Sequence, residues 1–183
     1  MKYTILFFVF IAFVSCKQDE KKARLSSSKP VYFDIKQIVE HDIYSNTTQN
    51  CSEEKSILVN RKSETHINQK VNWREEMQVL LDCDFNKAGW IGKFDSIVSA
   101  NGLSVSYVTM SSKIPIKKVT INYTEKKQAI NSIIIEKKMA TFLISNTQQL
   151  FYYPNISFKI IAKQSAIFMQ DFNTEIDVKF ICK

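Results

Sequence analysis

Apolar and polar residues alternate with a period of two along much of the second half of the chain. The segments concerned are 103–107, 119–123, 156–162 and 176–180. Because successive side chains of a strand point to opposite faces of a sheet, this period predicts strands with one buried and one exposed face. Segments 133–135 and 150–153 are apolar throughout, which is typical of strands covered on both faces.

The connections between these segments are short and polar, as at 125–128 and around Pro154. No helical pattern separates the expected strands. Strands that follow one another without a crossover helix pair in antiparallel fashion. The second half of the chain is therefore predicted to form an antiparallel meander.

Two segments of the first half have helical spacing instead. Apolar residues fall at i, i+3, i+4 and i+8 in the first, namely Ile35, Ile38, Val39 and Ile43. The second begins at Asn72, a good N-cap, with Glu75 three residues on. Its apolar stripe is Trp73, Met77, Leu80, Leu81 and Phe85. Between the two helices, segments 56–59 and 65–68 predict a hairpin.

The predicted fold class is therefore α+β. Two helices are expected to pack on a curved, mostly antiparallel sheet of about six to eight strands in meander order. Residues 31–183 have the length of one domain.

The amino terminus has the layout of a secretory signal: Lys2, then an uninterrupted apolar run of ten residues, 5–14, then Ser15. Such a run covers roughly half of a ~30 Å hydrocarbon core. The four residues 13–16, Phe-Val-Ser-Cys, resemble the lipobox of bacterial lipoproteins. The resemblance implies cleavage before Cys16 and a lipid on that cysteine. Residues 1–15 are thus the expected signal peptide.

Residues 16–30 are polar and offer almost nothing to bury, so we expect a flexible tether. Acidic residues soon after the lipidated cysteine resemble the surface-export signal of Bacteroidota lipoproteins. The expected location is the cell envelope, where lipid on Cys16 anchors the protein to the outer membrane. The periplasmic face and the cell surface both remain open.

Charge is unevenly distributed along the chain. Residues 31–101 hold eight basic and eleven acidic residues, whereas 102–170 hold nine lysines against Glu125 and Glu136. A basic half could face anionic lipid head groups or an acidic partner, or could be a solvated sheet face kept soluble by lysine. Export from the cytoplasm argues against nucleic acid as a partner.

Three cysteines remain after lipidation: Cys51, Cys83 and Cys182. They would lie in an oxidising compartment, where one disulfide plus a free thiol, or three reduced buried thiols, are the two options. Their spacing is not that of a metal site.

The sequence contains no recognisable catalytic set. Asp82, Asp84 and Asn86 could bind a hard cation, but the glycine and glutamate that an EF-hand loop requires are absent. A helix end with capping side chains is the preferred interpretation. His41 and His66 lie on different predicted elements. We therefore expect no metal, no cofactor and no enzymatic activity.

Four aromatic residues are the candidate ligand site. Trp73, Trp90, Phe151 and Tyr153 could line an apolar groove between sheet and helices that holds a lipid or acyl chain. The alternative is that they fill the core.

The segment 72–90, with 92–94 after it and 32–35 near the start, is similar to a group of small Bacteroidota lipoproteins of unknown function. The similarity covers nearly the whole mature chain and implies no activity. The sequence thus predicts a lipid-anchored envelope protein, a non-enzymatic binding or assembly module. The alternative function is a carrier of an apolar ligand. The partner, the membrane leaflet and the oligomeric state stay open.

Overall fold

The computed structural model describes residues 30–125, 129–167 and 169–182. The expected signal peptide, the lipidation site Cys16 and nearly all of the expected tether lie outside the described residues. The helices are α1 (Ile35–Thr48), α2 (Trp73–Glu76), α3 (Gln78–Leu81) and the short 3₁₀ helix η1 (Ala88–Trp90). The strands are β1 (Ser52–Val59), β2 (Lys62–Asn68), β3 (Asp95–Val98), β4 (Ser104–Val108), β5 (Ile116–Tyr123), β6 (Ile130–Ala140), β7 (Ile144–Tyr153), β8 (Ser157–Ala166) and β9 (Met169–Ile181).

All strands belong to a single nine-stranded sheet with the order β2-β1-β9-β8-β7-β6-β5-β4-β3. Every neighbouring pair is antiparallel. Strands β3 to β9 form the predicted meander, and the hairpin β1–β2 adds to its far side by pairing with β9. The antiparallel sheet is confirmed, but the expected count of six to eight strands is too low. Strand β3 is not among the predicted strands, because its apolar and polar residues do not alternate clearly.

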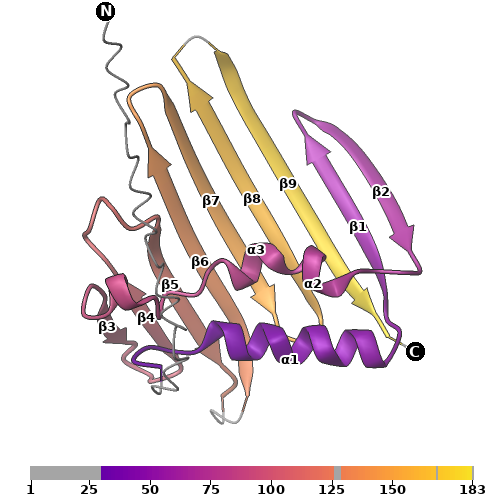
Figure 1. The fold of residues 1–183 in the computed structure, drawn as a ribbon, viewed down its shortest axis with the longest axis horizontal. Coiled ribbons are helices and arrows are strands. Elements are labelled where there is room, and N and C mark those ends of the chain that lie inside the picture. Colours follow the sequence, from indigo (N-terminus) through magenta and orange to yellow (C-terminus); the bar gives the residue numbers. More distant parts are fainter. Residues whose placement is uncertain (1–29, 126–128, 168, 183) are drawn as a thin grey trace, which may run out of the picture.

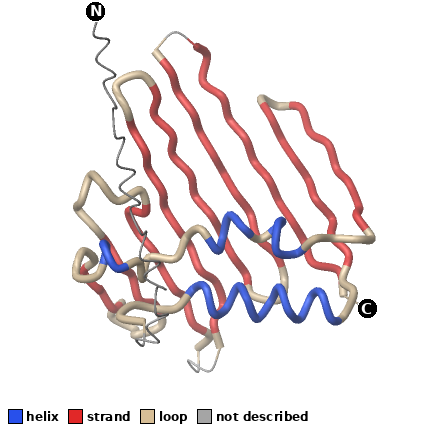
Figure 2. Tube along the Cα trace, in the orientation of Figure 1, coloured by secondary structure: helices blue, strands red, loops and turns tan. Residues whose placement is uncertain are grey.

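The helices lie side by side across one end of the long strands, on one face of the sheet (Figure 1). The other end of β6 to β9 extends well beyond them (Figure 2). Side chains between the helices and the sheet form the core. Its most deeply buried members include Val39, Met77, Leu80, Phe85, Val119, Ile121, Ile133, Ile135, Leu150, Tyr152 and Val178. The fold is therefore a sheet covered on half of one face.

Local sequence explains the ends of the helices. The Asp34 carboxylate accepts the backbone N–H of Gln37 at 3.0 Å and caps α1. The second predicted helix is in fact two four-residue helices, because the chain leaves regular helical geometry at Met77. The amide of Leu80 then donates to the carbonyl oxygen of Met77 at 3.0 Å, a tighter 3₁₀-type bond.

The β1–β2 hairpin is confirmed, with its turn at Asn60 and Arg61. Both residues have positive φ, 46° and 76°, as a two-residue turn that matches the twist of the strands requires. Gly102, part of the predicted turn at 101–102, also has positive φ, 67°.

The prediction that 133–135 and 150–153 are covered on both faces is wrong. Ile133, Ile135, Leu150 and Tyr152 are fully buried beneath the helices, whereas Tyr153 is 38 % exposed. Within residues 30–125, 129–167 and 169–182, no helix covers the opposite face of these strands. Continuous apolar runs arise here because the second face carries Ile and Phe side chains that remain half-buried.

A disulfide joins Cys51, just before β1, to Cys182, just after β9. The sequence left open one disulfide with a free thiol, or three reduced thiols. The structure has the first arrangement, because Cys83 is a buried free thiol. Burial is the main reason that the pKa of Cys83 rises to about 11.

A buried carboxylate links α1 to the sheet. Asp42 is fully buried, and its Oδ2 accepts the Tyr152 hydroxyl and the backbone N–H of Asn155, both at 2.6 Å. Burial first, and then the Asp42 carboxylate, raise the pKa of Tyr152 above its ordinary value. This network fixes the position of α1 along β7.

The segment at 32–33 and the segment at 84–86 contact each other. The Asn86 Oδ1 accepts the backbone N–H of Tyr32 at 2.8 Å, and its Nδ2 donates to the carbonyl oxygen of Phe33 at 3.2 Å. The Tyr32 ring stacks on Phe85, with centroids 5.3 Å apart. Asp84 accepts the backbone N–H of Asn86 at 2.8 Å. These polar residues therefore serve the joint between two chain segments.

Candidate functional site

The face of the sheet that the helices leave free carries a row of side chains across five strands. The register places Glu136, Gln149, Ile161, Glu175 and Leu58 opposite one another, in that order, on β6, β7, β8, β9 and β1. Each is one residue away from a side chain of the helical face. Because side chains alternate along a strand, the row points away from the helices.

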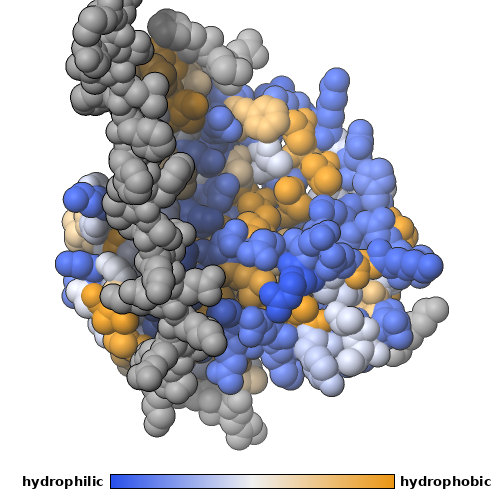
Figure 3. Space-filling view, viewed as in Figure 1, coloured by the Kyte–Doolittle hydropathy of each residue, from blue (hydrophilic) through white to orange (hydrophobic). Residues whose placement is uncertain are grey.

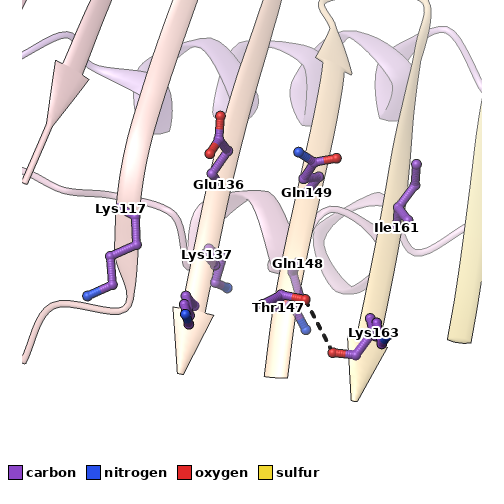
Figure 4. A pocket seen from close by; sticks show the side chains of 9 residues that line it. Lys117, Glu136, Lys137, Thr147, Gln148, Gln149, Ile161 and Lys163 are labelled. Atoms are coloured by element: carbon purple, nitrogen blue, oxygen red, sulfur yellow. Dashed lines mark hydrogen bonds between the residues drawn. The ribbon is translucent and has the colours of Figure 1, made fainter. Parts of the chain in front are cut away.

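A second row runs parallel to the first, nearer the free ends of the strands. Lys138, Thr147, Lys163 and Asn173 are paired across β6, β7, β8 and β9. We call the two rows together the open face. Figure 4 shows Glu136, Gln149 and Ile161 on three neighbouring strands, with Thr147 and Lys163 beside them.

The open face is hollowed at two adjoining places. The first hollow, of about 410 Å³, lies over β6 to β8 and includes Glu136, Gln149 and Thr147. The second, of about 690 Å³, lies over β8, β9 and β1 and includes Leu58, Asn173 and Glu175. Both share Ile161 and Lys163. The two hollows therefore form one continuous trough.

The first hollow is basic. Lys117, Lys137, Lys138 and Lys163 line it, against the single carboxylate of Glu136. Among the described residues, neither Lys137 nor Lys138 forms an ion pair. Lys137 alternates with Glu136 and Lys138 along β6 and its charge acts on the buried Cys83, so Lys138 is the one of the two that presents its charge on the open face.

Lys117 has a structural role. Its Nζ donates to the carbonyl oxygens of Ser111 and Ile114, at 2.7 and 2.6 Å, and so holds the loop between β4 and β5. Lys163 is paired with Asp171, so Lys138 is the lining cation of the open face that can turn toward a ligand.

The second hollow is balanced in charge. Arg61 and Lys163 lie with Asp171 and Glu175. Lys163 contacts Asp171 at 2.8 Å, and its hydrogen bond is the first cause of the lowered pKa of Asp171. Lys159 contacts Glu175 at 2.5 Å, which raises the pKa of Lys159. These exposed pairs keep the second hollow polar and near neutral.

The four aromatic residues predicted to line a groove do not come together. Trp73 is buried at 2 % exposure and packs edge-on against Phe180, with centroids 5.0 Å apart. Trp90 lies on η1 with the Lys87 ammonium 4.7 Å from its ring centroid. Phe151 and Tyr153 point to the open face. Core side chains fill the space between sheet and helices where the groove was expected.

Trp73 does line a separate hollow of about 470 Å³ at the end of α1, with Asn46 and Cys51. Asn46 is almost fully buried, and its Nδ2 has no hydrogen-bond partner among the described residues. A polar space of this kind is suited to bridging water.

The candidate catalytic and metal-binding residues are dispersed. His41 lies on the helix α1 and His66 on the edge strand β2. The described residues include no group of three His, Cys, Asp or Glu side chains placed to hold a metal ion. Within the same residues, the helices all fall short of the length and apolar character needed to cross a bilayer.

The open face has no recognisable motif in the sequence, because each of its residues is of a kind common on any strand surface. Glu136, Gln149 and Ile161 become neighbours only through the pairing of three strands. The excess of lysine in 102–170 was the one sequence signal that pointed to this region.

Comparison of the chain with protein-family models, with curated proteins and with solved structures found no match.

Proposed function

We propose that this chain is a lipid-anchored protein of the cell envelope that acts as a non-enzymatic binding module, with the open face as its ligand site. The observation that carries the proposal is the trough over β6 to β9 and β1, whose side chains are polar, accessible and held by a rigid sheet. A site built on strands needs little ordering when a ligand arrives, which favours binding.

The lining indicates the chemistry of the ligand. Lysine ammonium groups lie at one end, and amide and hydroxyl groups of Gln149 and Thr147 lie beside them. Ile161 supplies an apolar contact at the junction of the two hollows. The proposed ligand is therefore elongated and polar, with an anionic group next to hydrogen-bonding groups.

The membrane anchor is a separate part of the proposal. It is supported by the lipobox-like residues 13–16 alone. The mass of the amino-terminal peptide, measured after expression in a bacterium that processes lipoproteins, tests it. A diacylated or triacylated cysteine that Cys16→Ser abolishes is the expected result. An unmodified peptide that begins elsewhere refutes the anchor.

Native mass spectrometry of protein released gently from envelopes tests the ligand site. We expect a bound species with the wild type and its loss with Gln149→Trp, because the indole would fill the first hollow. Tyr44→Trp is the matched control, since Tyr44 is 71 % exposed on α1. Equal loss of the species in both variants, or cleavage of a broad panel of ester, glycan and peptide substrates, would contradict the proposal.

The alternative function, a carrier of an apolar ligand between sheet and helices, has less support. That space is occupied by the core, whose side chains Ile133, Ile135 and Leu150 have no exposure.

A further inference from the structure

The free ends of the long strands carry a cluster of exposed apolar side chains. Phe142 is 90 % exposed, and Met139, Leu143, Ile144 and Ile167 are exposed by 43 to 58 %. We call these five residues the apolar tip. They belong to the β6–β7 and β8–β9 turns, at the end of the sheet opposite the helices (Figure 1). Figure 3 shows apolar side chains at this end of the molecule as well as over the middle of the same face.

The apolar tip has a defined shape. The Thr141 N–H donates to the Ile144 carbonyl oxygen at 2.8 Å, and the Ile144 N–H donates to Thr141 Oγ1 at 3.1 Å. The Ile167 N–H donates to the Leu143 carbonyl oxygen at 3.2 Å, which ties the two turns together. The turns therefore hold large apolar side chains in water, although polar residues would form such turns at lower cost.

Lysines surround the base of the apolar tip. Lys138 precedes Phe142 by four residues on β6, which at about 3.3 Å per residue places it roughly 10–13 Å behind the tip. Lys163 is level with it on β8, through Thr147. Lys113 lies on the adjoining β4–β5 loop, which Lys138 contacts by donating its N–H to the Pro115 carbonyl oxygen at 2.8 Å.

In the described part of the chain, two of the three carboxylates near these lysines are already paired. Glu175 on β9 is paired with Lys159 and Asp171 with Lys163, whereas Glu136 on β6 forms no ion pair. This arrangement matches the surface of an anionic bilayer. There, apolar side chains enter by about 5–10 Å, and lysines behind them contact the lipid phosphates. The apolar tip borders a hollow of about 290 Å³. Its five side chains are few for a protein interface, which buries about 800 Å² and roughly 20–30 residues on each partner.

We propose that the apolar tip inserts into the head-group region of a membrane that contains anionic lipid, with Lys138 and its neighbours at the phosphates. This contact shares Lys138 with the first hollow of the open face, but it requires no ligand there. Next to a lipid on Cys16 it would be a second point of attachment, and two weak attachments hold a protein to a membrane far better than one. It would also orient the open face relative to the bilayer.

The test uses the full chain purified from membranes and reconstituted into phosphatidylcholine vesicles with and without phosphatidylglycerol. Phe142→Trp places a reporter in the apolar tip, and Tyr44→Trp is the matched control on α1. The emission of the parent protein, from Trp73 and Trp90, is subtracted. We expect the Phe142→Trp emission to shift to the blue and to be quenched by brominated acyl chains in anionic vesicles, and the control to do neither.

Adding Lys138→Glu should weaken the shift of Phe142→Trp, while Lys62→Glu on the edge strand β2 should leave it unchanged. Equal emission from the reporter and the control in anionic vesicles would overturn the proposal. A shift that appears without lipid and grows with protein concentration would also overturn it, because the apolar tip would then contact a second copy. The mass of the amino-terminal peptide reports the state of the anchor separately.

Discussion

The helix-covered half of the sheet and its uncovered regions are built from the same strands. Their side chains differ in burial: those under the helices form the core, and the others are in contact with solvent. On β6 and β7, Ile135 and Leu150 have no exposure, while their neighbours Glu136 and Gln149 face solvent on the open face. The period of two lets one strand serve both sides. We infer that stability resides on the covered side and that the open face and the apolar tip are free to serve recognition.

The disulfide gives the largest expected effect. Replacing Cys51 and Cys182 by serine should lower the free energy of unfolding by about 3–5 kcal/mol, since the bridge closes a loop between residues 131 apart. Urea unfolding monitored by circular dichroism measures it. Reductant should destabilise the wild type to a similar degree and leave the double variant unchanged. A loss below about 1 kcal/mol would show that the covered end holds together without the bridge.

The matched pair Leu150→Ala and Gln149→Ala tests the comparison directly. Leu150→Ala should cost about 2–5 kcal/mol, because it removes buried methyl groups and leaves a cavity under the helices. Gln149→Ala should change the free energy of unfolding by less than about 0.5 kcal/mol. Denaturant titration of both variants provides the values. Similar losses in both would mean that the open face contributes to stability as much as the core.

The buried Asp42 should contribute a smaller amount. Asp42→Ala leaves the Tyr152 hydroxyl and the Asn155 N–H without their acceptor, which should cost about 2–3 kcal/mol. The exposed Asp95 on β3 is a suitable control, with an expected change near zero. The free energy of unfolding of the Asp42→Ala and Asp95→Ala variants, measured by denaturant titration at neutral pH, distinguishes the two.

The same network predicts a loss of stability at alkaline pH. The folded protein raises the pKa of Tyr152 above the ordinary value of 10.0. The unfolded chain therefore releases this proton first, and the stability due to Tyr152 is complete below pH 10 and declines as the pH rises above it. Tyr152→Phe should have a flatter pH profile of unfolding over that range. An unchanged slope would contradict the role given to Tyr152.

The apolar tip should have the smallest effect on stability. Phe142→Ser should alter the free energy of unfolding by less than about 0.5 kcal/mol, since a side chain 90 % exposed loses no packing. Thermal unfolding checks this. A marked loss would assign Phe142 to the fold and remove the reason for seeking a membrane contact.

Much of the fold could be predicted from local patterns. The alternation in 119–123 and 176–180 identified strands, the stripe from Ile35 to Ile43 identified α1, and Gly102 marked a turn. These features depend on neighbouring residues alone. The docking of the β1–β2 hairpin against β9 could not be predicted, because it depends on contacts between residues more than a hundred positions apart, such as Ser56 and Asp177.

The candidate site was harder to predict than the fold. The aromatic residues Trp73 and Phe151 suggested one groove, but strand parity places them on opposite sides of the sheet. A run such as 150–153 conceals that parity, because both of its faces are apolar. The open face also needs the register of three strand pairs, which one sequence does not contain.

Site-specific photo-crosslinking in the living source cell tests the central claim most directly. A benzoylphenylalanine residue at position 173 samples the open face from the second hollow and leaves the first hollow unfilled, and one at position 44 samples the exposed side of α1. We expect a discrete adduct at position 173, with its mass giving the ligand, and none at position 44. An adduct at position 44 and none at position 173 would contradict the assignment of recognition to the open face.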